Sequence, residues 1–66
     1  MEIIVNGQAR EAREGISIAE LLAELQLNDK PVAVEVNLQL VPKRRHADHR
    51  LAAGDRLEIV TLVGGG

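Results

Sequence analysis

The sequence has no phenylalanine, tyrosine, tryptophan or cysteine among its 66 residues. Without aromatic rings there is no platform on which a nucleobase can stack, which argues against nucleic acid as a partner. Without cysteine the chain has neither disulfides nor thiolate metal ligands. Its apolar runs are too short for a membrane helix, which needs about 20 apolar residues. These absences predict a small cytoplasmic domain that binds neither a membrane nor nucleic acid.

The length allows one compact domain whose core is built from isoleucine, valine, leucine and alanine. A domain of this size buries only about 60% of its unfolded surface, so we expect a thin core and modest stability. The net charge is −2, and its two signs are unevenly distributed. Acids outnumber bases six to three in residues 1–30, whereas bases outnumber acids five to four in residues 31–66. Much of the basic charge lies in Lys43, Arg44, Arg45 and Arg50.

The first half of the chain predicts a β-hairpin followed by a helix. Residues 1–5 are rich in β-branched side chains, and Asn6-Gly7 is the dipeptide that best suits a type I′ turn. We expect the return strand over residues 8–13. Further along, apolar residues recur at helical spacing and form one stripe that faces a core: Ile18, Leu21, Leu22 and Leu25.

The boundaries of this helix are marked by capping signals. Ser17 and Glu20 have the spacing of a capping box, in which each side chain accepts a hydrogen bond from the backbone of the other residue. Asn28 is the expected C-terminal cap, and Pro31 prevents continuation. The predicted helix covers residues 17–27.

The second half of the chain predicts strands. Residues 32–36 alternate with period two, Asn37 is a turn residue, and residues 38–41 form a short strand that ends before a proline. Residues 43–50 are polar and are expected to form a loop with one 3₁₀ turn. Residues 56–62 form the strongest predicted strand, which we place at the centre of the sheet because it is apolar on both faces.

This element order favours an α+β fold of the β-grasp, ubiquitin-like type. One helix laid on one face of a mixed sheet of about four to five strands buries all the apolar faces together. The predicted domain covers residues 1–62, and residues 63–66 form a flexible tail.

The tail, Val63-Gly64-Gly65-Gly66, has two interpretations. Chain ends are commonly frayed and without consequence. Alternatively, glycines allow another protein to draw the chain end into a narrow active site, because a backbone without Cβ atoms permits close approach. Fully extended, the four residues span roughly 13 Å, enough to enter a cleft while the domain docks outside it.

Several segments together resemble the ThiS family of sulfur carriers in thiamine biosynthesis. The resemblance covers nearly the whole chain, and it rests on ordered spacing rather than on one motif. The matching segments are Ile3-Ile4-Val5-Asn6-Gly7, Leu21-Leu22, Val32-Ala33-Val34-Glu35-Val36-Asn37, Val41-Pro42-Lys43, Gly54-Asp55, Glu58-Ile59-Val60 and Val63-Gly64-Gly65-Gly66.

The resemblance implies that this chain is a cosubstrate and not an enzyme. A separate adenylyltransferase of the E1-like class would use ATP and Mg²⁺ to convert the Gly66 carboxylate to an acyl adenylate, with Val63, Gly64 and Gly65 threaded into its site. Sulfur from a cysteine desulfurase system would then displace AMP and leave a thiocarboxylate. A thiazole synthase would accept that sulfur. The carrier itself would bind no cofactor.

Other polar residues are candidates for weaker roles. His46 and His49 are three residues apart and could share a metal, but no further ligand is near, so we predict a solvated loop without metal. Lys43, Arg44 and Arg45 form either an ordinary solvated face or a surface that speeds docking to an acidic partner. Leu38, Leu40 and Leu62 either complete the core or form a partner-docking patch.

Three alternative functions remain. The small subunit of molybdopterin synthase shares the expected fold and tail, although those chains tend to be longer, with aromatic core residues. A ubiquitin-like modifier would be joined through Gly66 to lysines of target proteins. A passive binding module, for example one that touches RNA, would not need the tail. Removal of Gly65 and Gly66 separates these cases, because only the passive module would keep its function.

Overall fold

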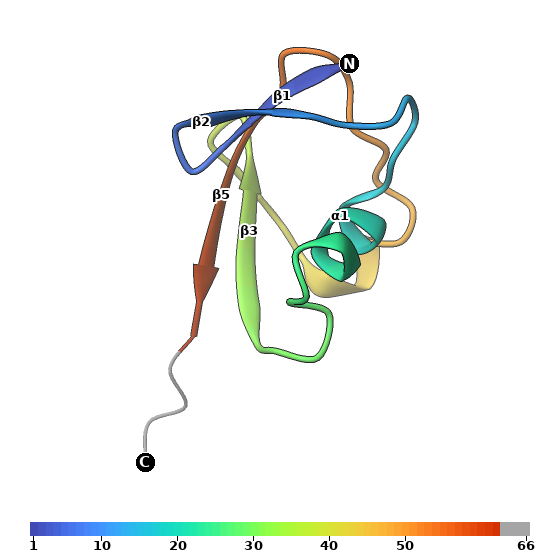
Figure 1. The fold of residues 1–66 in the computed structure, drawn as a ribbon. Helices are drawn as coiled ribbons and strands as arrows, with labels where there is room; N and C mark the ends of the chain where they lie inside the picture. The colour runs from blue at the N-terminus through green and yellow to red at the C-terminus, as the bar shows by residue number, and fades with distance from the viewer. Residues whose placement is uncertain (63–66) are drawn as a thin grey trace.

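The computed structural model describes residues 1–62 of the chain. Figure 1 shows a twisted sheet with a single helix lying over one of its faces. The strand order is β2-β1-β5-β3-β4; β1 and β5 are parallel, and the other neighbours are antiparallel. This is the expected β-grasp, with five strands. The elements are β1 (Glu2–Val5), β2 (Gln8–Glu11), α1 (Ile18–Glu24), β3 (Val32–Val36), β4 (Gln39–Val41), the 3₁₀ turn η1 (Lys43–Arg45) and β5 (Arg56–Thr61).

The first hairpin has the predicted turn. Asn6 and Gly7 both have positive φ, 51° and 83°, as a type I′ turn requires. Strand β2 is shorter than the expected 8–13 and ends at Glu11. A turn closed by a hydrogen bond from Ile16 N–H to Arg13 O, 3.2 Å, redirects the chain toward the helix.

Helix α1 begins as predicted but ends earlier than the predicted residue 27. Its last turn closes in a Schellman arrangement: Leu27 N–H donates to Leu22 O at 2.8 Å, and Gln26 N–H donates to Ala23 O at 3.0 Å. Gln26 has the left-handed φ of 60° that this motif needs. The prediction of Asn28 as the cap is therefore wrong. Glycine or asparagine usually occupies the left-handed position, so a glutamine there carries no signal of a helix end.

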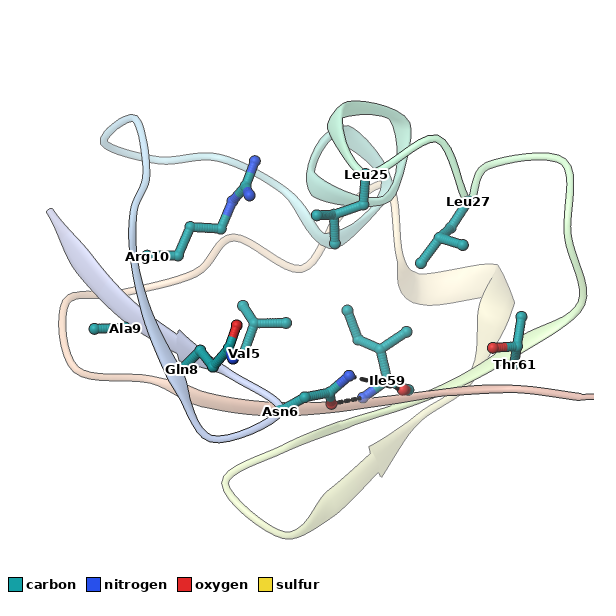
Figure 2. Close-up of a pocket in the computed structure, with 9 residues that line it drawn as sticks. All are labelled: Val5, Asn6, Gln8, Ala9, Arg10, Leu25, Leu27, Ile59 and Thr61. Carbon is teal, nitrogen blue, oxygen red and sulfur yellow. Dashed lines mark hydrogen bonds between the residues drawn. The ribbon is translucent and has the colours of Figure 1, made fainter.

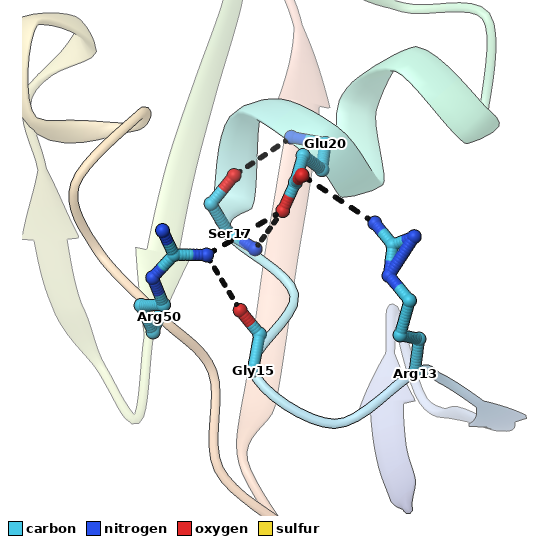
Figure 3. Close-up of polar contacts among 5 residues, drawn as sticks. All are labelled: Arg13, Gly15, Ser17, Glu20 and Arg50. Carbon is cyan, nitrogen blue, oxygen red and sulfur yellow. Dashed lines mark hydrogen bonds and ion pairs between the residues drawn. The ribbon is translucent and has the colours of Figure 1, made fainter.

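The helix N-terminus is held by the predicted capping box (Figure 3). Ser17 N–H donates to Glu20 Oε1 at 2.9 Å, and Glu20 N–H donates to Ser17 Oγ at 3.0 Å. Arg13 and Arg50 lie on either side of the same carboxylate, 3.5 and 3.8 Å away. Arg50 also donates to the Gly15 carbonyl at 2.9 Å. Glu20, expected only as a member of the capping box, thus also joins the helix start to two other segments.

Glu20 gives the fold a specific pH dependence. The hydrogen bond from Ser17 N–H, and next the one with the Ser17 side chain, hold the pKa of Glu20 below its ordinary value of 4.5, and the charges of Arg13 and Arg50 add to this. A lowered pKa in the folded state means that the ionised carboxylate stabilises the fold above its ordinary pKa. This stabilisation is lost as the pH falls through the lowered value.

We therefore expect Glu20→Gln to destabilise the domain at neutral pH. The difference from the wild type should shrink steadily as the pH falls below 4.5, because the wild-type carboxylate then becomes protonated. Urea denaturation of both proteins from about pH 7 to about pH 3 measures this convergence. A difference that stays constant over the whole range would contradict the assignment. Ser17→Ala removes the reciprocal cap and should cost about 1 kcal/mol at neutral pH.

The core lies between α1 and the sheet face that it covers. Its members are Ile3, Ala12, Ile16, Ile18, Leu21, Leu22, Val34, Val36, Val41, Leu51, Leu57 and Ile59. The opposite face of the sheet has no layer over it in Figure 1. Strand β5 is central, as predicted, but the reason given for it is wrong: only its Leu57 and Ile59 are buried, while Val60 is exposed. Within residues 1–62, α1 is too short to cross a membrane.

Candidate functional site

The candidate site is the chain end that follows β5. Strand β5 ends at Thr61, one residue earlier than expected, and Leu62 continues its direction with a 2.8 Å hydrogen bond from its N–H to Pro31 O. Neighbouring segments thus anchor β5 as far as Ile59 on the β1 side, and up to the last described residue on the β3 side. The predicted sulfur-carrying residue Gly66 and the predicted threading residues Val63, Gly64 and Gly65 lie outside the described residues.

Two asparagine side chains hold β5 in place. Figure 2 shows Asn6 paired with Ile59: Ile59 N–H donates to Asn6 Oδ1 at 2.7 Å, and Asn6 Nδ2 donates to Ile59 O at 3.2 Å. In the turn between β3 and β4, Asn37 holds the start of β5: Arg56 N–H donates to Asn37 Oδ1 at 3.0 Å. Asn37 Nδ2 also donates to Asp55 Oδ1 at 3.0 Å.

Sequence reasoning assigned these two asparagines only a role in turns. Each lies in the left-handed region, with φ of 51° at Asn6 and 52° at Asn37. The side chains, however, replace backbone pairing where the neighbouring strands end. They therefore position the strand that leads to the tail.

The uncovered face of the sheet carries exposed apolar side chains, which we call the open-face patch. It consists of Leu38, Leu40 and Val60, which are 88%, 66% and 55% exposed. Leu62 is 50% exposed but lines a hollow together with Leu22 and Leu27, so it is not counted in the patch. Leu38, Leu40 and Leu62 are thus exposed and not part of the buried core, and their role in docking stays a prediction. Val60 was missed because a strand apolar on both faces was read as buried on both.

Leu38 is exposed and also adopts an unusual backbone conformation. The second hairpin turn has positive φ at both Asn37 and Leu38, 52° and 70°. The left-handed region costs a residue with a Cβ roughly 1–2 kcal/mol, so leucine is a poor choice for this turn. Strand β4 consequently starts at Gln39 instead of Leu38. Neither packing nor backbone preference accounts for a leucine at this position.

Acidic side chains interrupt the open-face patch. Glu35 of β3 lies directly opposite Glu58 of β5, and Leu40 of β4 lies opposite Glu35 on its other side. Like charges at directly opposed positions of a sheet destabilise it. Neither glutamate has an ion-pair partner within residues 1–62. The open face thus combines apolar contact area with unpaired negative charge.

The basic segment and the histidines lie in the β4–β5 connection. Lys43, Arg44 and Arg45 form η1, and all three are exposed. His46 is buried, and its Nε2 lies 2.9 Å from Val41 O. The prediction of a solvated loop is therefore wrong at His46, which joins the loop to the core. No group of three or more metal-ligating side chains occurs in the part of the chain that the structure describes.

Comparison with known proteins places this chain in a family. The model of the ThiS family matches residues 3–66. A sulfur carrier protein ThiS of Escherichia coli is 32% identical over 66 residues, which cover all of both chains. A crystal structure of a thiamine biosynthesis protein, ThiS, from Geobacter metallireducens superimposes with a TM-score of 0.85 at 28% identity, and covers both chains completely.

A longer protein also contains the equivalent of the whole chain. A thiazole synthase of Paramagnetospirillum magneticum is 41% identical over 66 residues, and the chain spans 20% of the length of that protein. The match of the family model over residues 3–66, the E. coli relative and the full-length structural agreement show that the chain belongs to the ThiS family.

Proposed function

We propose that this protein carries sulfur in thiamine biosynthesis as a thiocarboxylate on Gly66. The observation that carries the proposal is the match to the ThiS family over residues 3–66, a range that includes the C-terminal glycines. The name of the E. coli relative, a sulfur carrier protein, supports the same role. The proposed setting is the cytoplasm.

The chemistry follows from the poor reactivity of a carboxylate. Ionised at neutral pH, the Gly66 carboxylate resists nucleophiles until it gains a better leaving group than oxide. We propose that an E1-like adenylyltransferase supplies one by joining the carboxylate to AMP from ATP with Mg²⁺, which releases pyrophosphate. A persulfide sulfur from a cysteine desulfurase system then displaces AMP and forms an acyl disulfide. A second thiol of that system cleaves the sulfur–sulfur bond, forms a disulfide with the cysteine that carried the persulfide, and leaves the thiocarboxylate.

A thiazole synthase is the proposed sulfur acceptor. Support comes from the Paramagnetospirillum thiazole synthase, a fifth of whose length resembles this entire chain. A carrier and its acceptor that occur in one polypeptide gain a high effective concentration for each other. In separate chains, docking must supply the same proximity.

Intact mass spectrometry tests the proposed cargo. Protein isolated from cells that make thiamine is expected to contain a species heavier by the mass difference between one sulfur and one oxygen atom. Fragmentation should place that difference on Gly66. The species should disappear when the adenylyltransferase is absent, and its persistence there or its location on another residue would contradict the proposal.

We propose the open-face patch as the docking surface for these enzymes. Its Val60 lies on β5, the strand that leads to the tail, and its Leu38 keeps a costly conformation that packing does not explain. The unpaired Glu35 and Glu58 fit a partner that presents a basic side chain among apolar ones. The exposed Lys43, Arg44 and Arg45 would raise the association rate with a partner that is acidic at that position.

Leu38→Gly separates the roles of this residue in docking and in folding. Glycine relieves about 1–2 kcal/mol of backbone cost but loses about 0.5–1 kcal/mol through the greater freedom of the unfolded chain. The free energy of unfolding should therefore stay the same or rise by up to about 1.5 kcal/mol, while the KM for the carrier in the adenylation reaction rises severalfold. Leu40→Ala, at an ordinary strand position, should raise KM without stabilising the fold. An unchanged KM in both variants would exclude the patch.

A further inference from the structure

A pocket of about 390 Å³ opens on the helix side of the sheet, between β2 and the C-terminal end of α1 (Figure 2). Val5 and Ile59 lie on its sheet side, and Leu25 and Leu27 project toward it from the end of the helix. Arg10 of β2 lines the same pocket. Its volume lies in the range of ligand-binding sites in proteins. The pocket is separate from the open-face patch, which lies on the other face of the sheet.

Arg10 has an unmet hydrogen-bonding requirement at this pocket. Its Nε is buried and has no hydrogen-bond partner among residues 1–62. Within the same range, its Nη2 is held by a long contact of 3.4 Å to Glu24 Oε1. A buried donor without an acceptor is unfavourable, and a carboxylate is the acceptor that best matches a guanidinium. The site therefore favours a ligand that brings a carboxylate oxygen to Arg10 Nε.

The outer edge of β2 is open to strand addition. Strand β2 is the edge strand of the sheet. Ile4 N–H donates to Asp55 O, 2.9 Å away, and therefore points away from β2. Ile4 of β1 lies opposite Ala9 of β2, so these two residues form a non-hydrogen-bonded pair. By the same alternation, the N–H and C=O groups of Ala9 and Glu11 point away from the sheet. They have no partner within residues 1–62.

We propose that β2 and this pocket bind an extended acidic peptide segment of a partner protein. The peptide pairs with Ala9 and Glu11 as an additional strand, which places alternate side chains over the helix side of the sheet. One of these is apolar and enters the pocket between Val5 and Leu25. The next on that face, two positions along, is aspartate or glutamate and accepts a hydrogen bond from Arg10 Nε. The proposal concerns binding alone and does not depend on the sulfur chemistry.

A titration followed by ¹⁵N NMR tests this site in the full chain. The probe is a peptide of threonine residues with both ends capped, in which one position is valine and the position two residues later is aspartate. We expect saturable shifts at Arg10 Nε and at the amides of Ala9, Glu11 and Leu25. Replacing aspartate by asparagine in the probe should weaken binding at least tenfold. Absence of saturable shifts, or equal binding of both peptides, would overturn the proposal.

Variants of the protein separate the parts of the site. Arg10→Gln should weaken binding at least tenfold, whereas the matched control Arg13→Gln, which is outside the pocket, should not change it. Glu24→Gln removes a competing negative charge and should tighten binding severalfold. Ala9→Pro removes an outward N–H at an edge position where proline is tolerated, so it should abolish peptide binding.

Two further outcomes would argue against a peptide. If sodium acetate shifts Arg10 Nε as strongly as the peptide does and Ala9→Pro has no effect, the site binds small carboxylates and the edge strand takes no part. If the same amides shift with protein concentration alone, the occupant is a second copy of this chain. Normal far-ultraviolet circular dichroism for each variant confirms that lost binding is not lost folding.

Discussion

Removal of Gly65 and Gly66 is expected to abolish sulfur transfer completely and to leave the domain as stable as the wild type. The proposed reaction takes place on the Gly66 carboxylate, and a carboxylate at the truncated end would stop two residues short of the activating site. The twelve buried core residues found within residues 1–62 all lie from Ile3 to Ile59, so the loss of two C-terminal residues removes none of them. Pyrophosphate release with the adenylyltransferase measures the first effect, and urea denaturation measures the second.

A matched control keeps the length of the tail and removes only its charge. Protein with Gly66 capped as a C-terminal amide should bind the adenylyltransferase but release no pyrophosphate, because the amide offers no carboxylate oxygen to ATP. Thiazole formation by the truncated or the amidated protein would contradict the carrier function. It would favour a passive binding module instead. Lysine-linked conjugates that form only with intact Gly66 would favour a protein modifier.

Leu57→Ala is expected to be the most damaging single change to the fold. Leu57 is fully buried in the central strand and lies opposite Val36 of β3 and Val5 of β1. Leucine-to-alanine changes in cores cost about 2–5 kcal/mol. A domain of 66 residues has a total stability of roughly 3–10 kcal/mol at about 0.05–0.15 kcal/mol per residue. The variant should therefore lose a large share of the stability, and at the low end of this range it should be largely unfolded at 25 °C.

Val60→Ala is the control for this change, because it removes methyl groups from the same strand. Val60 points to the uncovered face and is 55% exposed, so it leaves little cavity behind. Its cost should stay below about 1 kcal/mol, mostly from the strand preference of valine. Urea denaturation of both variants gives the comparison. Similar losses of unfolding free energy in the two variants would mean that the helix-covered face does not dominate the stability of the domain.

Much of the fold was predictable from the sequence where neighbouring residues alone decide the conformation. Asn6-Gly7 specified its turn because both residues tolerate positive φ. Ser17 and Glu20 specified the helix start because each satisfies a backbone amide of the other. The end of the helix was not predictable in this way. It depends on Gln26, a residue with no particular preference for the left-handed conformation it adopts.

The sequence by itself determined the β-grasp order of elements, the helix start, the first hairpin turn and the family, because these depend on local backbone preferences and on ordered motifs. Only the tertiary structure decided which apolar residues are exposed, that His46 is buried against Val41, and that Asn6 and Asn37 hold β5. Periodicity tells which side chains share a face of a strand. It does not tell whether a second layer covers that face, and with a single helix only one face of this sheet can be covered.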